Sequence, residues 1–243
     1  MSNKKISLIL ILFLIATASL NAKVFLVSVG VSDYPGTKLD LNLPVEDAKT
    51  ITEIYSRNTE LRYCQLLNED ATKAKILTAI NKVFSSAGEN DIVVFFYSGH
   101  GYEGGFRVYD TYLSYDEIRK AMSKSICKNK MIFADACFSG QLRTEKPSSQ
   151  SDIDASKNAN VMLFLSSRSN EVSMENKIMK NGFFTTYLYK GLKGDADKNK
   201  DRIISASELF LYVHDEVTII SGDRQHPVMW GKFPNDMPVM IWK

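Results

Sequence analysis

The stretch VVFFYSGHGYEGG, residues 93–105, guides the interpretation of the whole sequence. It opens with four β-branched or aromatic residues, which is typical of a buried strand. The apolar run then gives way to Ser98, Gly99, His100 and Gly101. A core strand has no need of an imidazole between two glycines, so we expect a functional group where this strand ends.

Apolar runs of this kind recur along the chain and alternate with segments of helical spacing. Strands are expected at 23–34, 62–70, 91–98, 130–137 and 160–167, and helices at 44–58, 71–88 and 114–124. Nearly continuous apolar strands that alternate with helices are typical of a parallel sheet covered on both faces. The sequence therefore predicts an α/β fold, with one domain over residues 23–243.

The composition is that of an ordinary globular protein: 243 residues, 44% hydrophobic and 24% charged. Lys and Arg together number 30 and Asp and Glu 28, and no block of basic residues occurs. Phosphate backbones are bound by clustered positive charge, so a nucleic-acid partner is not expected.

The N-terminus has the pattern of a secretory signal peptide. Lys4 and Lys5 precede a short apolar run, and small residues follow up to Ala22. Cleavage after about residue 18–22 would remove both lysines and leave a net charge of 28 − 28 = 0. We expect a periplasmic or extracellular protein without a stable membrane anchor, the alternative being an uncleaved anchor. An exported protein with three cysteines, Cys64, Cys127 and Cys137, has at least one free thiol.

Two of the predicted strands end in side chains that together can carry out nucleophilic catalysis by cysteine. The strand at 91–98 leads to His100, and the strand at 130–137 ends at Cys137. Ligands of open α/β sheets bind at the carboxyl ends of the strands, where these side chains would meet. A histidine can take the proton of a thiol and later protonate a leaving amine. The Gly101 and Cys137 amides are the predicted oxyanion hole.

The segments YSGHG (97–101) and DACFSG (135–140) resemble the histidine and cysteine motifs of caspase-like peptidases, in particular the metacaspase and bacterial caspase-homologue branch. The resemblance covers roughly residues 23–243. It implies a three-layer sandwich with a mostly parallel sheet of about six strands. It also implies that His100 is the general base and acid and Cys137 the nucleophile of an endopeptidase.

The resemblance further implies an acidic pocket for a basic substrate side chain, formed by Asp135, Asp47 and Ser98. The match at Asp47 is partial, because Pro44 stands where the family pattern has a cysteine. We therefore expect cleavage after Arg or Lys in peptide or protein substrates. The alternatives are a structural role for Asp135, as a buried carboxylate that holds a loop, and a solvated helix position for Asp47.

Two loops carry further expectations. The polar, serine-rich loop at about 141–159 contains Arg143, Lys146 and Lys157, which are candidate sites of self-cleavage, although any exposed loop contains a few basic residues. Ser166, at the end of the strand at 160–167, is a candidate substrate contact or simply part of a polar loop.

The segment DKNKDRIISASE, residues 197–208, has the ligand spacing of an EF-hand loop. The predicted calcium ligands are Asp197, Asn199, Asp201, the carbonyl of Ile203, Ser205 and Glu208. Arg202 stands where such loops have glycine, which opposes binding. The alternative is a helix start at which Ser205 and Glu208 form a capping box.

Two other functions compete with this interpretation. One is a catalytically silent protein that keeps the fold as a binding scaffold. The other is a peptidase specific for Asp, which would need a basic pocket residue such as Arg107 or Arg168. His214 and His226 show no zinc-ligand spacing with His100, so a zinc hydrolase is not favoured. The chemistry requires no cofactor, and the oligomeric state stays open.

Overall fold

A sheet of mostly parallel strands forms the centre of the computed structural model, which describes residues 22–58, 60–102, 104–137, 160–167 and 180–242. The main strands lie in the order β2-β1-β3-β6-β7-β9, of which the first five are parallel and β9 is antiparallel. Their bounds are β1 (Val24–Gly30), β2 (Leu61–Leu67), β3 (Ile92–Tyr102), β6 (Asn129–Cys137), β7 (Val161–Leu165) and β9 (Val228–Trp230).

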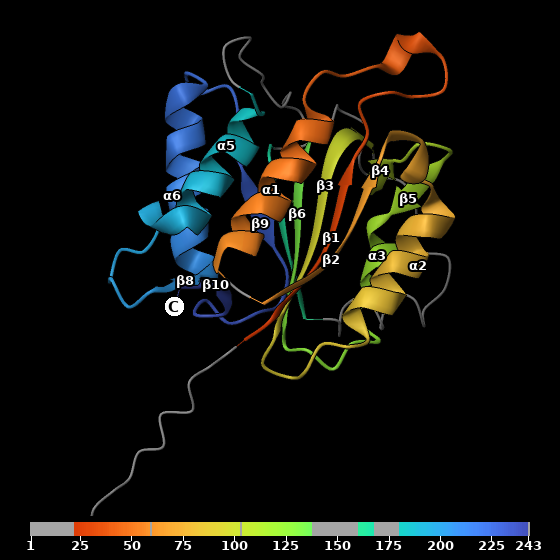
Figure 1. Cartoon of the computed structure of the whole chain (residues 1–243). Helices are drawn as coiled ribbons and strands as arrows, with labels where there is room; N and C mark the ends of the chain where they lie inside the picture. Colours follow the sequence, from red (N-terminus) through yellow and green to blue (C-terminus); the bar gives the residue numbers. More distant parts are fainter. Residues whose placement is uncertain (1–21, 59, 103, 138–159, 168–179, 243) are drawn as a thin grey trace, which may run out of the picture.

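Helices cover both faces of this sheet (Figure 1). One face carries α2 (Lys73–Phe84) and α3 (Tyr115–Met122). The other carries α1 (Pro44–Asn58), α5 (Phe183–Lys190) and α6 (Ala206–Ile220). Successive strand residues point to opposite faces, so they fall alternately into two buried cores. In β1, Phe25, Val27 and Val29 face the first pair of helices, while Val24 and Leu26 face the other three.

The predicted three-layer α/β fold is confirmed, and several element bounds are corrected. The strands expected at 23–34 and 62–70 end at Gly30 and Leu67. The second helix ends at Phe84 rather than at Gly88. The third strand continues to Tyr102, because β4 (Gly105–Arg107) pairs with its last residues and with β5 (Tyr112–Ser114). Three-residue strands are too short to show a period of two, so these two elements could not be predicted from the sequence.

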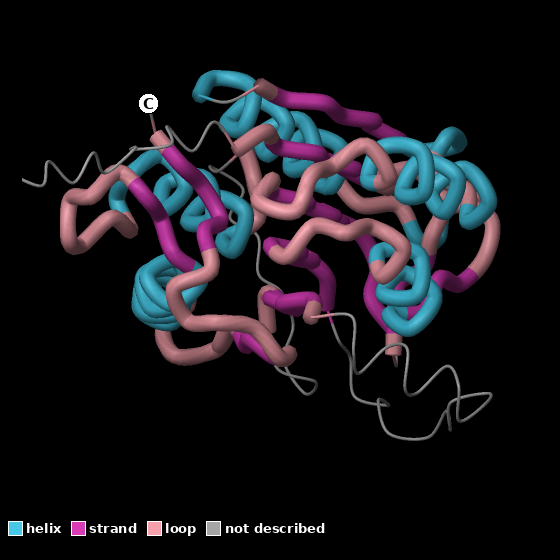
Figure 2. Tube along the Cα trace, turned by 90° about the horizontal axis from the view of Figure 1, so that it is seen from below, coloured by secondary structure: helices cyan, strands magenta, loops and turns pink. Residues whose placement is uncertain are grey.

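The remaining strands lie beside the main sheet (Figure 2). They are β8 (Ile203–Ser205) and β10 (Pro238–Ile241), which pair antiparallel with each other. The chain also forms η1 (Thr37–Leu39), η2 (Asn68–Asp70) and η3 (Gly191–Asp195), the last directly after α5. None of the helices in the described part of the chain is long and apolar enough to cross a membrane.

Local sequence signals explain where several helices begin. Pro44 is the first residue of α1, where its missing N–H costs nothing. Thr72 caps α2 by accepting a hydrogen bond from the Lys75 amide. Ser114 and Glu117 form a capping box at the start of α3. These residues fix where each helix begins in the layer that covers the sheet.

Phe164 is the best place to test the core under α5 and α6, because its buried ring contacts those of Phe133, Phe184 and Phe210. We expect Phe164→Ala to lower the free energy of unfolding by about 3–5 kcal/mol, measured by urea denaturation. Leu211 on α6 is 48% exposed. The control Leu211→Ala should therefore change stability by less than about 0.5 kcal/mol. Equal losses in the two variants would contradict this description of the core.

Candidate functional site

The pairing of β3 with β6 brings the predicted site residues together at one edge of the sheet. In the parallel register Ser98 is opposite Asp135, and His100 is opposite Cys137. Each strand thus contributes one residue to a predicted acidic pocket and, two positions later, one residue to the predicted dyad. Along both strands, the pair of predicted pocket residues therefore comes first and the pair of predicted dyad residues follows two positions later.

The imidazole of His100 is held by the backbone of the loop after β1. His100 Nε2 lies 2.8 Å from the carbonyl oxygen of Leu39, at the end of η1. A carbonyl can only accept, so Nε2 carries the proton of the neutral ring. Nδ1 is then the unprotonated nitrogen and is available as a base.

The backbone of His100 is bound as well. Its N–H donates to Tyr34 Oη (3.0 Å), and its carbonyl accepts from Tyr97 Oη (3.1 Å). Gly99 has φ +152°, and a Cβ there would lie 2.5 Å from Tyr97 Oη and 2.8 Å from Tyr34 Oη. A side chain at position 99 would displace both hydroxyls, which explains the glycine before the histidine.

Asp47, near the start of α1, is buried beneath the first turn of α5, with 2% of its surface exposed. Its Oδ2 accepts from Ser98 Oγ (2.8 Å). Its Oδ1 accepts from Asn181 Nδ2 (2.8 Å) and from the Gly182 amide (3.2 Å). The alternative of a solvated helix position for Asp47 is therefore wrong.

Asp135 lies against the same segment. Its Oδ2 accepts from the Thr185 amide (3.0 Å) and from Thr185 Oγ1 (2.8 Å). A Cβ on Gly182 would come within 2.5 Å of this oxygen, so only glycine lets α5 approach so closely. These contacts unite Ser98, Asp47 and Asp135 in one site, and they also agree with the alternative structural role of Asp135.

The start of α5 is the part of the site that sequence reasoning missed. Asn181, Gly182 and Thr185 supply amide, hydroxyl and backbone donors to the two carboxylates, at the end of a helix that favours negative charge. The asparagine and glycine before an apolar helical pattern were a signal for a helix start. Nothing in the sequence indicated that this start would meet Asp47 and Asp135.

The two buried carboxylates influence one another. Burial raises the pKa of Asp47 well above its ordinary value, and the neighbouring negative charge of Asp135 raises it further. The bonds from Asn181, Ser98 and Gly182 oppose this shift without cancelling it. The site is therefore short of positive charge, and a cationic group is the ligand that would relieve it.

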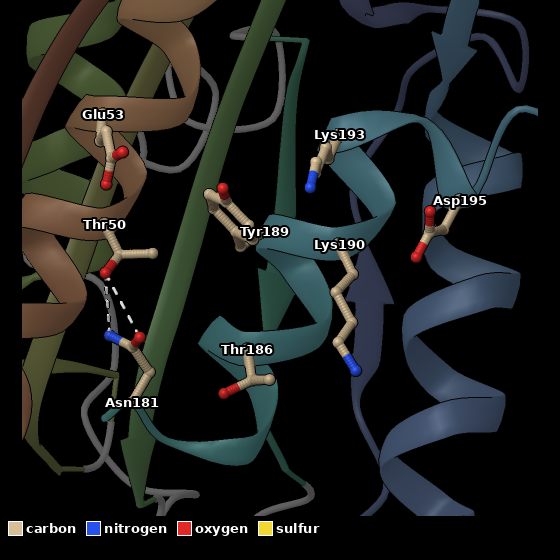
Figure 3. Close-up of a pocket in the computed structure, with 8 residues that line it drawn as sticks. All are labelled: Thr50, Glu53, Asn181, Thr186, Tyr189, Lys190, Lys193 and Asp195. Atoms are coloured by element: carbon tan, nitrogen blue, oxygen red, sulfur yellow. Dashed lines mark hydrogen bonds between the residues drawn. The ribbon is translucent and has the colours of Figure 1, made fainter. Parts of the chain in front are cut away.

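A cavity of about 440 Å³ lies among α1, α5 and η3 (Figure 3). Asn181 is one of its wall residues and is joined to Thr50 by two hydrogen bonds, of 3.1 and 3.3 Å. The other wall residues are Glu53, Thr186, Tyr189, Lys190, Lys193 and Asp195. Asn181 thus connects the surface between α1 and α5 to the carboxylate of Asp47.

Ser166 does not have the surroundings expected of a substrate contact. It has no exposed surface. Its hydroxyl donates to the Ala136 carbonyl (3.0 Å) and lies 3.1 Å from the Ala136 amide. It therefore holds β6 just before Cys137, and a direct contact with substrate has no support in this geometry.

The remaining predicted residues divide into those that are described and those that are not. Gly101 pairs with Phe106 of β4, one position after the His100–Cys137 pair, so both predicted oxyanion amides lie at the same edge. The guanidinium of Arg107 lies over the ring of Tyr112. Arg168, most of the predicted signal peptide and the loop with Arg143, Lys146 and Lys157 lie outside the described residues.

Cys64 and Cys127 are both free thiols in the structure. Burial raises the pKa of the Cys127 thiol to about 11 and raises that of Cys64 as well. Neither has the low pKa of a reactive cysteine.

In the segment at 197–208, acidic side chains accept hydrogen bonds from backbone amides of the same segment. Glu208 Oε2 accepts from the Ser205 amide (3.0 Å) and from Ser205 Oγ (2.7 Å), which is the capping box at the start of α6. Asp197 and Asp201 accept from the amides of Arg202 and Ile203. Among the described residues, no group of three or more His, Cys, Asp or Glu side chains is placed to hold a metal ion. Calcium binding stays a prediction.

Comparison with known proteins agrees with this geometry. The family model described as the caspase domain matches residues 24–237. The structure is similar to a protein from Geobacter sulfurreducens (TM-score 0.67, 19% identity, 91% of this chain and 100% of that chain). It is equally similar to caspase-1 from Spodoptera frugiperda (TM-score 0.67, 14% identity, 92% of each chain). No curated protein matches the chain significantly.

The raised pKa of Asp47 predicts that its carboxylate costs stability. The penalty is absent below the ordinary pKa of 3.8, where the carboxyl is protonated whether folded or unfolded, and it is complete above the raised pKa of the folded state. An amide fits the same contacts, with its oxygen toward Asn181 and Gly182 and its nitrogen toward Ser98. Asp47→Asn should therefore have a higher Tm than wild type at about pH 8, and the difference should shrink toward about pH 4. A Tm difference independent of pH would contradict the assignment.

Proposed function

The chain belongs to the caspase domain family, whose members are cysteine endopeptidases, and we propose that it hydrolyses peptide bonds with His100 and Cys137. The observation that carries the proposal is the β3–β6 register. It sets His100 opposite Cys137, two positions beyond Ser98 opposite Asp135. A silent scaffold would have no reason to keep both dyad residues beside a buried acidic pair.

The reaction follows from this arrangement. Nδ1 of His100 takes the proton of the Cys137 thiol, and the sulfur attacks the carbonyl carbon of the scissile bond. The amides of Gly101 and Cys137 stabilise the oxyanion. The imidazolium then protonates the leaving amine, and an acyl-enzyme remains. A water molecule, deprotonated by the same imidazole, releases the acid product and restores the thiol.

The substrate side chain next to the scissile bond is Arg or Lys in this proposal. Asp47 and Asp135 offer two carboxylates whose mutual repulsion a guanidinium or ammonium group would relieve. An Asp side chain would add a third negative charge to the same place. The guanidinium of Arg107, the described residue considered for Asp specificity, lies over the ring of Tyr112.

Export and self-processing complete the proposal. We expect removal of residues 1–22 and activity in the periplasm or outside the cell. With a basic specificity, Arg143, Lys146 and Lys157 are the sites at which the enzyme would cut its own loop. Mass spectrometry of the purified protein tests both points, with Cys137→Ala as the variant that keeps the loop intact.

Fluorogenic peptides that end in Arg, Lys or Asp test the specificity. We expect wild type to cleave the Arg and Lys peptides and Cys137→Ala to cleave none. Asp135→Asn should lose about 100-fold or more in kcat/KM for Arg, because the buried charge that pairs with the guanidinium is gone. Asp91→Asn is the matched control at the opposite end of β3. Cleavage of the Asp peptide alone would keep the dyad and refute the acidic pocket.

Calcium is tested separately by titration calorimetry. Coordination by Glu208 would require it to leave the capping box with Ser205, so we expect an affinity no tighter than about 1 mM. Glu208→Gln should remove the binding heat. If wild type shows no heat at about 10 mM calcium, the segment is a helix start only.

A further inference from the structure

Two buried tyrosines bind the backbone of His100 from both sides. Tyr34 is 5% exposed, lies in the loop after β1 and accepts the His100 N–H at 3.0 Å. Tyr97 is fully buried, lies three residues earlier in β3 and donates to the His100 carbonyl at 3.1 Å. The two hydroxyls are 3.3 Å apart, and both also lie within hydrogen-bond distance of the Arg107 carbonyl.

The protons of this cluster can be assigned. Each hydroxyl has one proton to donate, and the pair faces two carbonyl acceptors, those of His100 and Arg107. Tyr34 accepts from the His100 amide, and the assignment in which Tyr34 donates to the Arg107 carbonyl and Tyr97 to the His100 carbonyl gives each carbonyl a donor. Burial raises the pKa of both phenols, so both remain neutral donors over the pH range in which a cysteine peptidase works. Every polar group in the cluster then has a partner.

One loop binds His100 at two points. Tyr34 holds its backbone N–H, while Leu39, five residues later, holds the proton on Nε2 of its ring. The loop is closed on itself, because the Tyr34 amide donates to Asp40 Oδ1 (3.0 Å). The ring of Tyr34 also lies 5.1 Å from the imidazole, measured between ring centroids. Backbone and side chain of His100 are thereby fixed relative to each other.

We propose that Tyr34 and Tyr97 are positioning residues for the reaction: their hydroxyls hold the backbone of His100 so that Nδ1 meets the Cys137 thiol and the Gly101 amide is aimed at the oxyanion. Gly99 is the residue that makes room for the two hydroxyls. The inference rests on the proposed peptidase function. It goes beyond that function because it assigns the geometry of the dyad to two buried residues outside the dyad.

The test uses the mature protein with Tyr34→Phe, Tyr97→Phe and the double variant. Tyr55→Phe is the matched control: Tyr55 is also fully buried and its hydroxyl donates to the Val239 carbonyl (3.1 Å), within the core under α1. Kinetics with the Arg peptide give kcat and KM separately. Alkylation of Cys137 by iodoacetamide, followed over pH by mass spectrometry, reports the thiolate without any substrate. Thermal unfolding confirms that each variant is folded.

We expect each single variant to lose about 10- to 100-fold in kcat with KM within about twofold, since small displacements of a reacting group cost this much. The pH dependence of Cys137 alkylation should shift toward that of an ordinary thiol. The double variant should lose less than the product of the single losses, because both hydroxyls act on His100. Tyr55→Phe should lower the Tm and leave kcat and alkylation unchanged.

Two results would overturn the inference. One is a kcat and an alkylation profile within twofold of wild type in both single variants. The other is an equal loss in Tyr55→Phe, which would make the effect one of stability alone. If the wild type cleaves no peptide, the proposed function fails, and the alkylation profiles still decide whether the tyrosines position His100. If Tyr97→Phe does not fold, Tyr34→Phe decides in the same way.

Discussion

The rest of the site depends on one constraint, the parallel register of β3 and β6. Because side chains alternate along a strand, a slip of one residue would send Asp135 to the opposite face of the sheet and pair His100 with Ala136. The register is protected by the apolar residues that both strands bury in the two cores. The same burial that stabilises the fold thus fixes the spacing of the reacting groups.

The buried acidic pair carries an energetic penalty. Asp47 and Asp135 lose most of their contact with water and lie near a like charge, and the donors around them offset only part of that penalty. Three of the residues that donate come from one segment, Asn181 to Thr185. A fold selected for stability alone would place apolar residues here, and the proposed binding of a cationic substrate would account for the retained charges.

The layers and the meeting of His100 and Cys137 at one sheet edge could be predicted from the sequence because their signals are local: continuous apolar strands, helical spacing and two motifs at strand ends. The partners of those motifs could not. Asn181 is 134 residues from Asp47 and Tyr34 is 66 from His100, so only the tertiary fold brings them together. For Ser166 the sequence leaves a substrate contact and a polar loop open, and only the tertiary structure shows that its hydroxyl donates to the Ala136 carbonyl.

The site is held from both layers of helices, and this has a consequence for how activity depends on folding. Tyr34 and Tyr97 belong to the core under α2 and α3, whereas Asp47 lies on α1 and Thr185, which donates to Asp135, lies on α5, over the other core. The dyad therefore lies between two separately packed cores. Loosening either one would move one half of the site relative to the other: the first would release His100, and the second would open the acidic pocket. Catalytic geometry in this chain is thus a property of the complete sandwich rather than of the two motifs that reveal it.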